Sequence, residues 1–183
     1  MRRVLFIALV VVAMLAPAAA RPVSVSLDPS RTEIDFAIEA VGFPTTRGVF
    51  RAFTGRITID FDHPDRSRIA LTVEAASLDT GAPALDDYIR SSAFLNTARF
   101  PEITFVSTAV EKLDERTVRV TGDLSLMGVT KPADFDVGVD RRGGTVALSA
   151  SGVLQRSRYG LINGQPLVSD DVTITVATEV AAR

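Results

Sequence analysis

The stretch RITIDFDHPDRSRIALTVEA, residues 56–75, contains two alternating segments joined by a polar turn. Every second side chain is apolar on both sides of the turn, namely Ile57, Ile59 and Phe61 before it and Ile69, Leu71, Val73 and Ala75 after it. Strict alternation predicts β-strands with one apolar and one polar face. Because a short turn joins the two segments, the stretch predicts an antiparallel strand pair.

The same alternation extends outward from this pair to six further segments. They cover residues 33–40, 103–105, 118–126, 134–140, 146–154 and 172–176. Strands with one solvent-exposed polar face are typical of antiparallel sheets, and their apolar face must be covered from solvent. Only one short segment has helical spacing, so the sheet has to close as a barrel or fold over as a sandwich. Short turns between several neighbours favour a barrel. We therefore predict an all-β fold, an eight-stranded antiparallel up-and-down barrel.

Alternation stops within residues 78–105, between the third and fourth predicted strands. Leu85, Tyr88 and Ile89 follow helical spacing behind Pro83, which suits a first helical turn. We predict one short helix within residues 83–92. Because a helix of about ten residues is marginal in water on its own, it must pack on the rest of the protein through four anchors: Ile89, Phe94, Leu95 and Phe100.

Four small residues gather, in an up-and-down order, at the barrel end from which the helical segment leaves: Ala40, Ala75, Ala150 and Gly152. An eight-stranded barrel is either filled by its own side chains or holds one small ligand. One interpretation is therefore an open space at this end, with the helix as its lid. The alternative is that the small residues only relieve crowding and the helix plugs the end. An interior filled by Phe36, Phe105 and Phe135 would exclude the first interpretation.

The first twenty residues, MRRVLFIALVVVAMLAPAAA, have a basic start, an apolar run and small residues at the end. This layout is typical of a cleavable export signal, and we predict cleavage after Ala20. A membrane span takes about 20 apolar residues, and neither this run nor any later one is that long. We therefore expect residues 21–183 to form a single exported domain without a transmembrane segment.

The chain has no cysteine, and its formal net charge is −2. Nucleic acid is an unfavourable partner because phosphate binding requires a dense positive surface. The lack of cysteine removes disulfides, thiolate metal sites and a lipidation site. Export without disulfides is compatible with the bacterial periplasm, where we expect the protein to reside.

Residues for catalysis or metal binding are scarce. His63 is the only histidine, and it lies in a predicted turn that supplies no partners for a metal ion. A serine hydrolase needs a base beside its nucleophile, which a lone histidine in a turn does not provide. We therefore predict no catalytic residue, no metal site and no cofactor.

Several motifs span the chain in consistent order: GVFRAFTGRITIDF at 48–61, LDTG at 78–81, FPEITFVST at 100–108, GDLSLMGVTKP at 122–132, RSRYG at 156–160 and VSDDV at 168–172. Together they resemble the YceI-like family of periplasmic polyisoprenoid-binding proteins, over residues 27–180. The resemblance implies a lipocalin-like barrel whose apolar pocket holds a polyisoprenoid or quinone tail, and it implies no reaction. The family usually carries a His-Ser pair where this chain has Arg31–Thr32, and single histidines where it has Gly42, or a neighbour of it, and Tyr88. Any ligand selection that used those imidazoles therefore differs in this chain.

On this basis we predict a binding, carrier or storage protein for an isoprenoid lipid or another long-chain amphiphile. The predicted lining is Phe36, Ile38, Phe53, Leu71, Val73, Ile89, Phe94, Phe105, Leu124, Phe135, Leu148 and Val176. The candidate head-group contacts are Tyr88, Arg90, Arg156 and Arg158, whose alternative role is surface solubility. Two other classes stay open: a ligand-free envelope adaptor, and a barrel enzyme with a polar cluster in its lumen. The oligomeric state, a homodimer included, also stays open.

Overall fold

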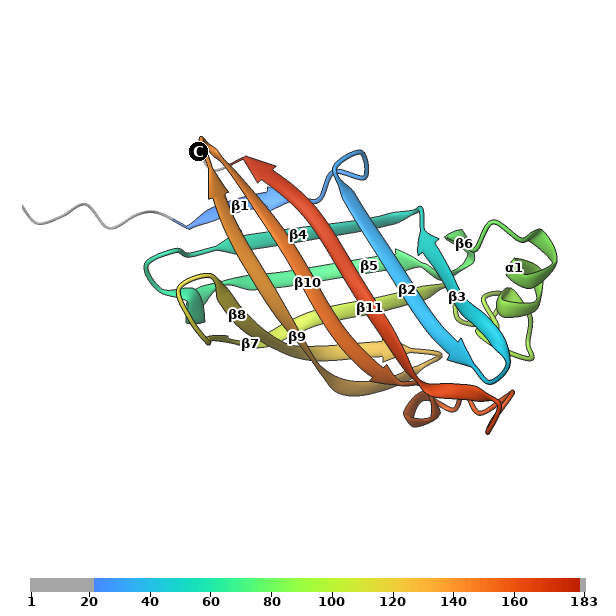
Figure 1. Ribbon diagram of the computed structural model, residues 1–183. Helices are drawn as coiled ribbons and strands as arrows, with labels where there is room; N and C mark the ends of the chain where they lie inside the picture. Colours follow the sequence, from blue (N-terminus) through green and yellow to red (C-terminus); the bar gives the residue numbers. More distant parts are fainter. Residues whose placement is uncertain (1–21, 182–183) are drawn as a thin grey trace, which may run out of the picture.

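The computed structural model describes residues 22–181, which form an antiparallel sheet curled into a half-barrel with one short α-helix (Figure 1). The all-β prediction is confirmed. The strands are β1 Val23–Ser26, β2 Thr32–Ala40, β3 Phe43–Phe50, β4 Phe53–Ile59, β5 Arg68–Glu74, β6 Leu78–Asp79, β7 Glu102–Lys112, β8 Thr117–Leu126, β9 Val129–Arg142, β10 Thr145–Gln155 and β11 Val168–Ala181. The helix is α1 Pro83–Arg90, and three 3₁₀ turns are η1 Pro64–Arg66, η2 Ala75–Ser77 and η3 Arg156–Tyr159.

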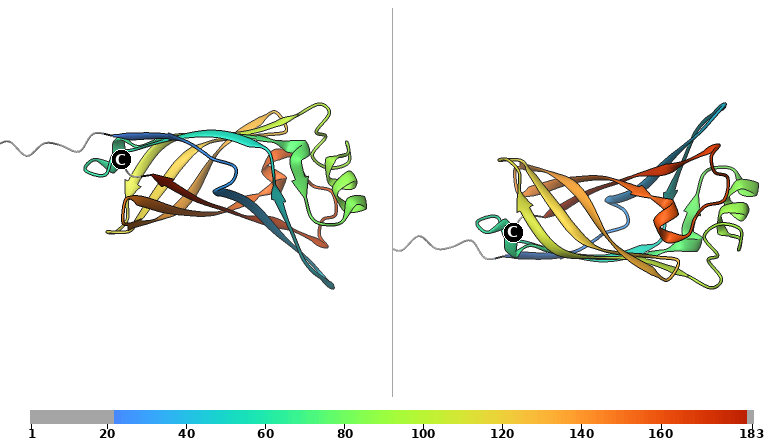
Figure 2. Two further views of the ribbon diagram at one scale, coloured as in Figure 1. Left: turned by 90° about the horizontal axis from the view of Figure 1, so that it is seen from above. Right: turned by 90° about the horizontal axis from the view of Figure 1, so that it is seen from below.

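The strand order in the sheet is β1-β4-β5-β7-β8-β9-β10-β11-β2-β3-β6, and every pairing is antiparallel. In Figure 1 the long strands β9, β10, β11 and β2 cross in front of β4, β5, β7 and β8. Figure 2 shows the curl from above and below, with α1 at one end and the β2–β3 hairpin extending beyond the sheet at that same end.

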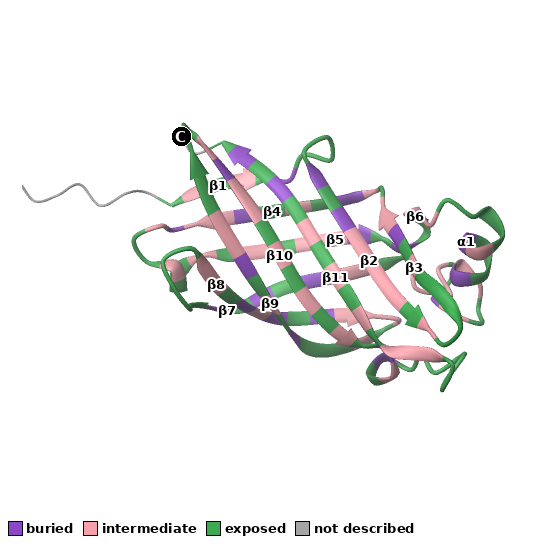
Figure 3. Ribbon diagram, viewed as in Figure 1, coloured by how far each residue is buried: buried purple, intermediate pink, exposed green. Residues whose placement is uncertain are grey.

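Alternating side chains set the two faces of the long strands. β10 and β11 stay in register from Thr145–Ala181 to Gln155–Asp171, and exposed residues alternate with less exposed ones along both strands (Figure 3). The ion pairs Arg119–Asp136 and Arg142–Asp140 lie on the polar face. The apolar face therefore turns toward the inside of the curl, as alternation predicts.

The predicted number of eight strands is wrong, because the described residues contain eleven. All eight predicted strands are present, as β2, β4, β5, β7, β8, β9, β10 and β11. The additional strands are β1, β3 and β6. β3 begins with Phe-Pro-Thr-Thr in a hairpin that is exposed on both faces, so its start has no apolar alternation to detect. β6 has only two residues, which is too short for a pattern.

Two strand breaks lie side by side. Only Arg51 and Ala52 separate β3 from β4, and η2 separates β5 from β6. The break regions hydrogen-bond to each other, since Arg51 N–H donates to Ser77 O (3.2 Å) and Glu74 N–H donates to Ala52 O (2.9 Å). The chain thus passes from β3, which pairs with β2 and β6, into β4, which pairs with β1 and β5.

Helix α1 begins at Pro83, as predicted, and ends two residues before the predicted limit. Its Asp86 is buried and reaches back to the preceding loop, where it accepts hydrogen bonds from Thr80 N–H (2.8 Å) and Thr80 Oγ1–H (2.7 Å). Ile89 packs in a buried cluster with Leu78, Leu95 and Leu161. These contacts supply the packing that a helix of eight residues requires.

No helix within residues 22–181 combines the length and the apolar character needed to cross a membrane. The predicted export signal, residues 1–20, lies outside the described residues. The division into that signal and a single domain over residues 21–183 stays a prediction.

Candidate functional site

An apolar cavity of about 330 Å³ lies inside the curl of the sheet. Side chains from both sides of the curl line it, including Leu71 of β5, Phe105 of β7 and Leu148 of β10. Toward one end the lining continues onto α1 and η3, through Ile89 and Tyr159. Its volume is at the lower end of the range of ligand pockets, which is about 300–1,000 Å³.

The structure brings the predicted lining together, apart from one residue. The cavity is lined by Phe36, Ile38, Leu71, Val73, Ile89, Phe94, Phe105, Leu124, Phe135, Leu148 and Val176. Phe53 lies instead in a neighbouring buried cluster with Leu27, Ile57 and Val73, and it does not line the cavity.

Large rings pack over glycines of neighbouring strands along the wall of the cavity. Phe36 of β2 pairs with Gly48 of β3, and a Cβ on Gly48 would lie 2.5 Å from Phe36 Cζ. The ring therefore occupies the space that a side chain at residue 48 would need. Packing of a ring on a cross-strand glycine is a recurring device of curved sheets.

The same arrangement recurs twice on the other strands. A Cβ on Gly122 of β8 would lie 2.4 Å from Phe105 Cζ, and one on Gly152 of β10 would lie 2.7 Å from Phe135 Cδ1. The Phe105 and Phe135 rings also meet edge to face, with their centroids 5.2 Å apart. The three phenylalanines therefore line the wall rather than fill the interior.

The small residues serve both of the purposes considered from the sequence. Ala40 and Ala150 line the cavity, so they provide space. Gly152 instead accommodates the Phe135 ring, and Ala75 is buried in η2 without lining the cavity. Some of the small residues therefore provide space in the cavity, and others only relieve crowding.

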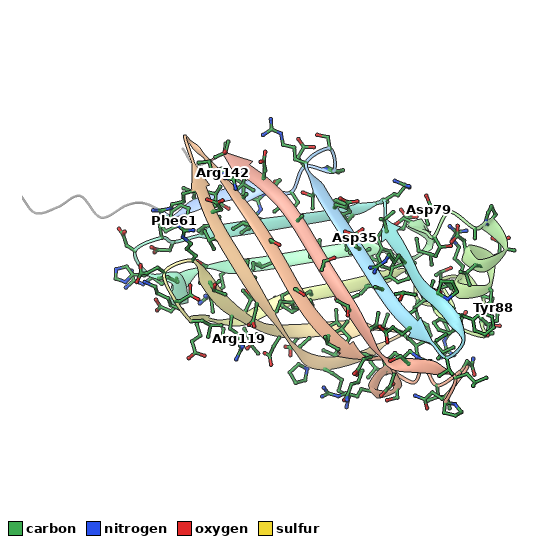
Figure 4. All side chains as sticks on the ribbon, in the orientation of Figure 1. Asp35, Phe61, Asp79, Tyr88, Arg119 and Arg142 are labelled. Carbon is green, nitrogen blue, oxygen red and sulfur yellow. The ribbon has the colours of Figure 1, made fainter. Side chains whose placement is uncertain are left out.

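Helix α1 and the segment after it border one end of the cavity. Leu85, Tyr88, Ile89 and Phe94 all line it, and the Tyr88 and Phe94 rings lie 6.0 Å apart. Tyr88 is nevertheless 49% exposed, so the cavity reaches the surface beside α1. Figure 4 shows Tyr88 at this end, whereas the ion-paired Arg119 and Arg142 lie away from it.

Arg156 is the one charged residue of the lining, and it is only 2% exposed. Its Nε–H donates to Ser169 O (2.7 Å), Nη1 to Leu161 O (2.6 Å) and Asn163 O (2.8 Å), and Nη2 to Val168 O (3.0 Å). Four of its five N–H groups thus fix the backbone of the loop before and at the start of β11. Burial lowers the pKa of the Arg156 guanidinium from its usual range.

Neither of the other candidate arginines lines the cavity. Arg90 points back to the chain before α1, where Nε–H donates to Ala76 O (2.9 Å) and Nη2 donates to Leu78 O. Arg158 is exposed. Of the four candidate head-group contacts, only Tyr88 and Arg156 therefore lie at the cavity.

Sequence reasoning missed lining residues of two kinds. Ile34, Ile174 and Val172 lie on the alternating apolar faces of β2 and β11, so the signal that identified their neighbours applied to them too. Tyr159 and Leu161 come from η3 and the loop after it, where no periodic pattern exists.

The lining can hold a hydrocarbon but offers little for chemistry. It contains no aspartate, glutamate, histidine or serine, and its polar side chains are those of Thr46, Thr104, Thr178, Tyr88, Tyr159 and Arg156. His63 lies between β4 and β5, outside this lining. Within residues 22–181 no group of three or more histidine, cysteine, aspartate or glutamate side chains could hold a metal ion.

Comparisons with known proteins agree on one family. The family described as YceI-like domain matches residues 26–180. Protein YceI of Escherichia coli O157:H7 is 33% identical over 152 residues, which cover 80% of this chain and 79% of that protein. A UPF0312 protein of Pseudomonas putida strain W619 is 36% identical with the same coverage.

Solved structures share the fold at lower sequence identity. Burkholderia cenocepacia BcnA superimposes with a TM-score of 0.80 at 22% identity, covering 85% of this chain and 99% of that one. A polyisoprenoid binding domain from Saccharophagus degradans, implicated in plant cell wall breakdown, has a TM-score of 0.68 at 17% identity, covering 89% of this chain and 100% of that one.

Proposed function

The chain belongs to the YceI-like domain family, and from this premise we propose that it binds the tail of an isoprenoid lipid, a polyprenyl chain or a quinone tail, without catalysing a reaction. One observation carries the proposal: the curl of the sheet encloses an apolar cavity whose lining has no carboxylate or imidazole. The name of the similar Saccharophagus degradans domain is consistent with such a ligand.

Burial of a hydrocarbon tail is sufficient for binding without specific polar contacts. Each buried methylene contributes about 0.8 kcal/mol, so a five-carbon prenyl unit contributes about 4 kcal/mol at most. About four such units approach the practical ceiling of noncovalent affinity before the costs of ordering and association are subtracted. The length and shape of the cavity therefore select the tail.

The head group would lie at the end bordered by α1 and η3. Tyr88 and Arg156 both line the cavity there, and a pyrophosphate or quinone oxygen would be attracted by the guanidinium charge. Since four N–H groups of Arg156 already bind carbonyl oxygens, its contribution is mainly electrostatic. Arg90 and Arg158 would act only from outside the cavity.

The finer architecture that suits this function is a closed barrel. Ten of the strands would form eight continuous segments around the ring, namely β2, β3 with β4, β5 with β6, β7, β8, β9, β10 and β11, with β1 added at the edge of β4. The hydrogen bonds between the two strand breaks support this ring, since β3–β4 and β5–β6 run side by side through them.

The setting we propose is the periplasm, where the protein would carry or store the lipid. The support is the export-signal pattern of residues 1–20 and the absence of cysteine. Immunoblotting of periplasmic and cytoplasmic fractions of the native host tests this directly, and a protein that stays uncleaved in the cytoplasm would contradict it.

Native mass spectrometry of the protein purified from its own host, followed by lipid extraction and identification, tests the function. We expect a complex with a mass increment that the extract identifies as a prenyl lipid. Ala150→Phe should reduce that complex strongly, because Ala150 lines the cavity and a phenyl ring there occupies ligand space.

The matched control is Ser151→Phe, which places the same ring on the exposed face of β10. We expect it to retain the lipid. Wild-type protein that is consistently empty would refute the proposal and favour the adaptor alternative. Equal retention by Ala150→Phe and Ser151→Phe would show that a lipid is bound elsewhere.

A further inference from the structure

Four large apolar side chains protrude at the end of the molecule that carries the cavity mouth. We call them the apolar rim: Val41 (70% exposed), Phe43 (74%), Ile162 (61%) and Leu167 (60%). Val41 and Phe43 belong to the turn of the β2–β3 hairpin, and Ile162 and Leu167 to the loop between η3 and β11. Figure 2 shows this hairpin and this loop at the same end as α1. Clustered exposed apolar side chains of this size mark an interaction surface.

The two halves of the apolar rim lie next to each other. Val41 N–H donates a hydrogen bond to Leu167 O (2.8 Å), which joins the hairpin turn to the loop. Arg156 binds the carbonyl oxygens of Leu161, Asn163 and Val168, so it holds the loop backbone on both sides of Ile162 and Leu167. The protruding side chains are therefore presented from a fixed backbone.

The apolar rim continues into the cavity. Ala40, Leu161 and Val168 line the cavity, and they are the immediate chain neighbours of Val41, Ile162 and Leu167. A hydrocarbon that touches the rim thus meets an apolar surface all the way inward.

Charged residues are absent from the segments that build the apolar rim. Residues 40–46 and 159–168 contain none, although 23% of the whole chain is charged. Exposed Arg47 and Arg158 flank one end of each segment, and exposed Glu39 and the uncharged Ser169 flank the other ends. An uncharged apolar edge suits insertion at the interface of a lipid bilayer, where apolar side chains enter the acyl region and charged side chains stay among the head groups.

We propose that the apolar rim inserts into the surface of a phospholipid bilayer and places the cavity mouth against the membrane. This inference rests on the proposed lipid-binding function and adds the site at which the lipid is taken up or delivered. A bilayer fits the rim better than a second copy of the chain, because the rim borders the opening through which a tail must pass. The bilayer supplies both the apolar contact and the tail.

The chain contains no tryptophan, so a single introduced tryptophan reports on its own surroundings. In Phe43→Trp, titration with dioleoylphosphatidylcholine vesicles should shift the emission to shorter wavelength, and lipids brominated on the acyl chain should quench it. The matched control is Leu113→Trp, an exposed apolar position in the turn between β7 and β8. We expect no shift and no quenching there. Equal responses at both positions, or none at either, would overturn the proposal.

A second comparison separates this inference from the proposed function. The rim variant, Val41→Ser/Phe43→Ser/Ile162→Ser/Leu167→Ser, should have a partition coefficient to the same vesicles that is at least about tenfold lower than that of wild type. The control variant Val106→Ser/Leu113→Ser should not.

Binding of farnesol, measured without vesicles, should be equal in wild type and rim variant, because no rim residue lines the cavity. Wild type that binds farnesol but not vesicles refutes docking alone. If wild type binds neither farnesol nor vesicles, both proposals are refuted. If the rim variant differs from wild type only by changing from dimer to monomer, the apolar rim is an interface between two copies of the chain and not a membrane-docking surface.

Discussion

Arg156 has a structural role beside the cavity in addition to its proposed interaction with a head group. Its buried guanidinium donates to four backbone carbonyls, two in the loop after η3 (Leu161 and Asn163) and two at the start of β11 (Val168 and Ser169). Hydrogen bonds from a charged donor are stronger than neutral ones. Arg156 therefore contributes strongly to holding the loop before β11, together with the backbone hydrogen bonds of the loop itself.

We predict that Arg156→Met lowers the free energy of unfolding by about 3 kcal/mol or more, because it leaves buried carbonyls without donors. Urea denaturation measures this. Arg158→Met is the matched control, since Arg158 is exposed in the same 3₁₀ turn, and it should change stability by less than about 0.5 kcal/mol. If both variants retain a pyrophosphate lipid as wild type does, the proposed head-group role of Arg156 is refuted.

Gly48 offers a test of how the phenylalanine rings keep the cavity open. Gly48→Ala should push the Phe36 ring off the wall and into the cavity, because the new Cβ would lie 2.5 Å from Phe36 Cζ. Overpacking of this kind costs about 1–3 kcal/mol. We expect lower stability, measured by denaturation. We also expect that the longest prenyl alcohol the variant binds is shorter than the longest one wild type binds, as measured with a series of alcohols of increasing chain length.

The control for this change is Gly138→Ala on β9. A Cβ at residue 138 would meet only Ser149 O, at 3.7 Å, which is an ordinary contact. This variant should keep wild-type stability and chain-length preference. A Gly48→Ala protein that binds tails as long as wild type does would show that the ring does not set the cavity.

At the scale of residues, all but one of the twelve predicted lining residues lie at the cavity, most of them on the alternating apolar faces of strands. The exception, Phe53, directly follows the Arg51–Ala52 break, outside the alternating run from which Ile57 and Ile59 were read. The contribution of Gly48, Gly122 and Gly152 could not be predicted, because only the curled sheet shows which ring meets which glycine.

At the scale of elements, a carboxylate connects η3 to β11 in addition to the hydrogen bonds of Arg156. Asp170 accepts hydrogen bonds from Ser157 Oγ–H (2.7 Å) and Ser157 N–H (2.8 Å). These bonds favour the ionised form, so they hold the pKa of Asp170 below its usual value. A depressed pKa in the folded state stabilises the fold above the unfolded pKa of about 4, and the contribution disappears as the pH falls through the folded value.

We therefore predict that Asp170→Asn is less stable than wild type at pH 7 and that the difference becomes smaller as the pH falls below the unfolded pKa of about 4. Thermal unfolding from pH 7 to pH 2 measures both curves. Asp171→Asn, at the next residue of β11, is the control and should follow the wild-type curve throughout. A stability difference for Asp170→Asn that persists unchanged at low pH would mean that the hydrogen-bond geometry, rather than the charge, is responsible.

The elements also mark where sequence reasoning stops. The long strands and α1 were predictable because each has a continuous pattern and one buried face. β3 was not, since its first residues extend with the hairpin into solvent and form part of the apolar rim instead of the sheet interior. The missing alternation at that hairpin reflects its exposed position.

At the scale of the whole molecule, one curled sheet forms the wall of the cavity and encloses it. The three phenylalanines that could have filled the interior lie on glycines of the next strand, and the cavity between the two sides of the curl stays apolar and open. The proposed lipid binding rests on this arrangement, and the proposed membrane docking rests on the apolar rim beside it. The central claim is therefore that the interior holds a ligand in place of the protein's own side chains.

A crystal structure of the protein purified from its host with its endogenous lipid tests this claim most directly. We predict continuous density for a hydrocarbon chain between Leu71 and Leu148, with the rings of Phe36, Phe105 and Phe135 still on Gly48, Gly122 and Gly152. Density that shows these rings turned inward and filling the interior, with no ligand between them, would contradict it.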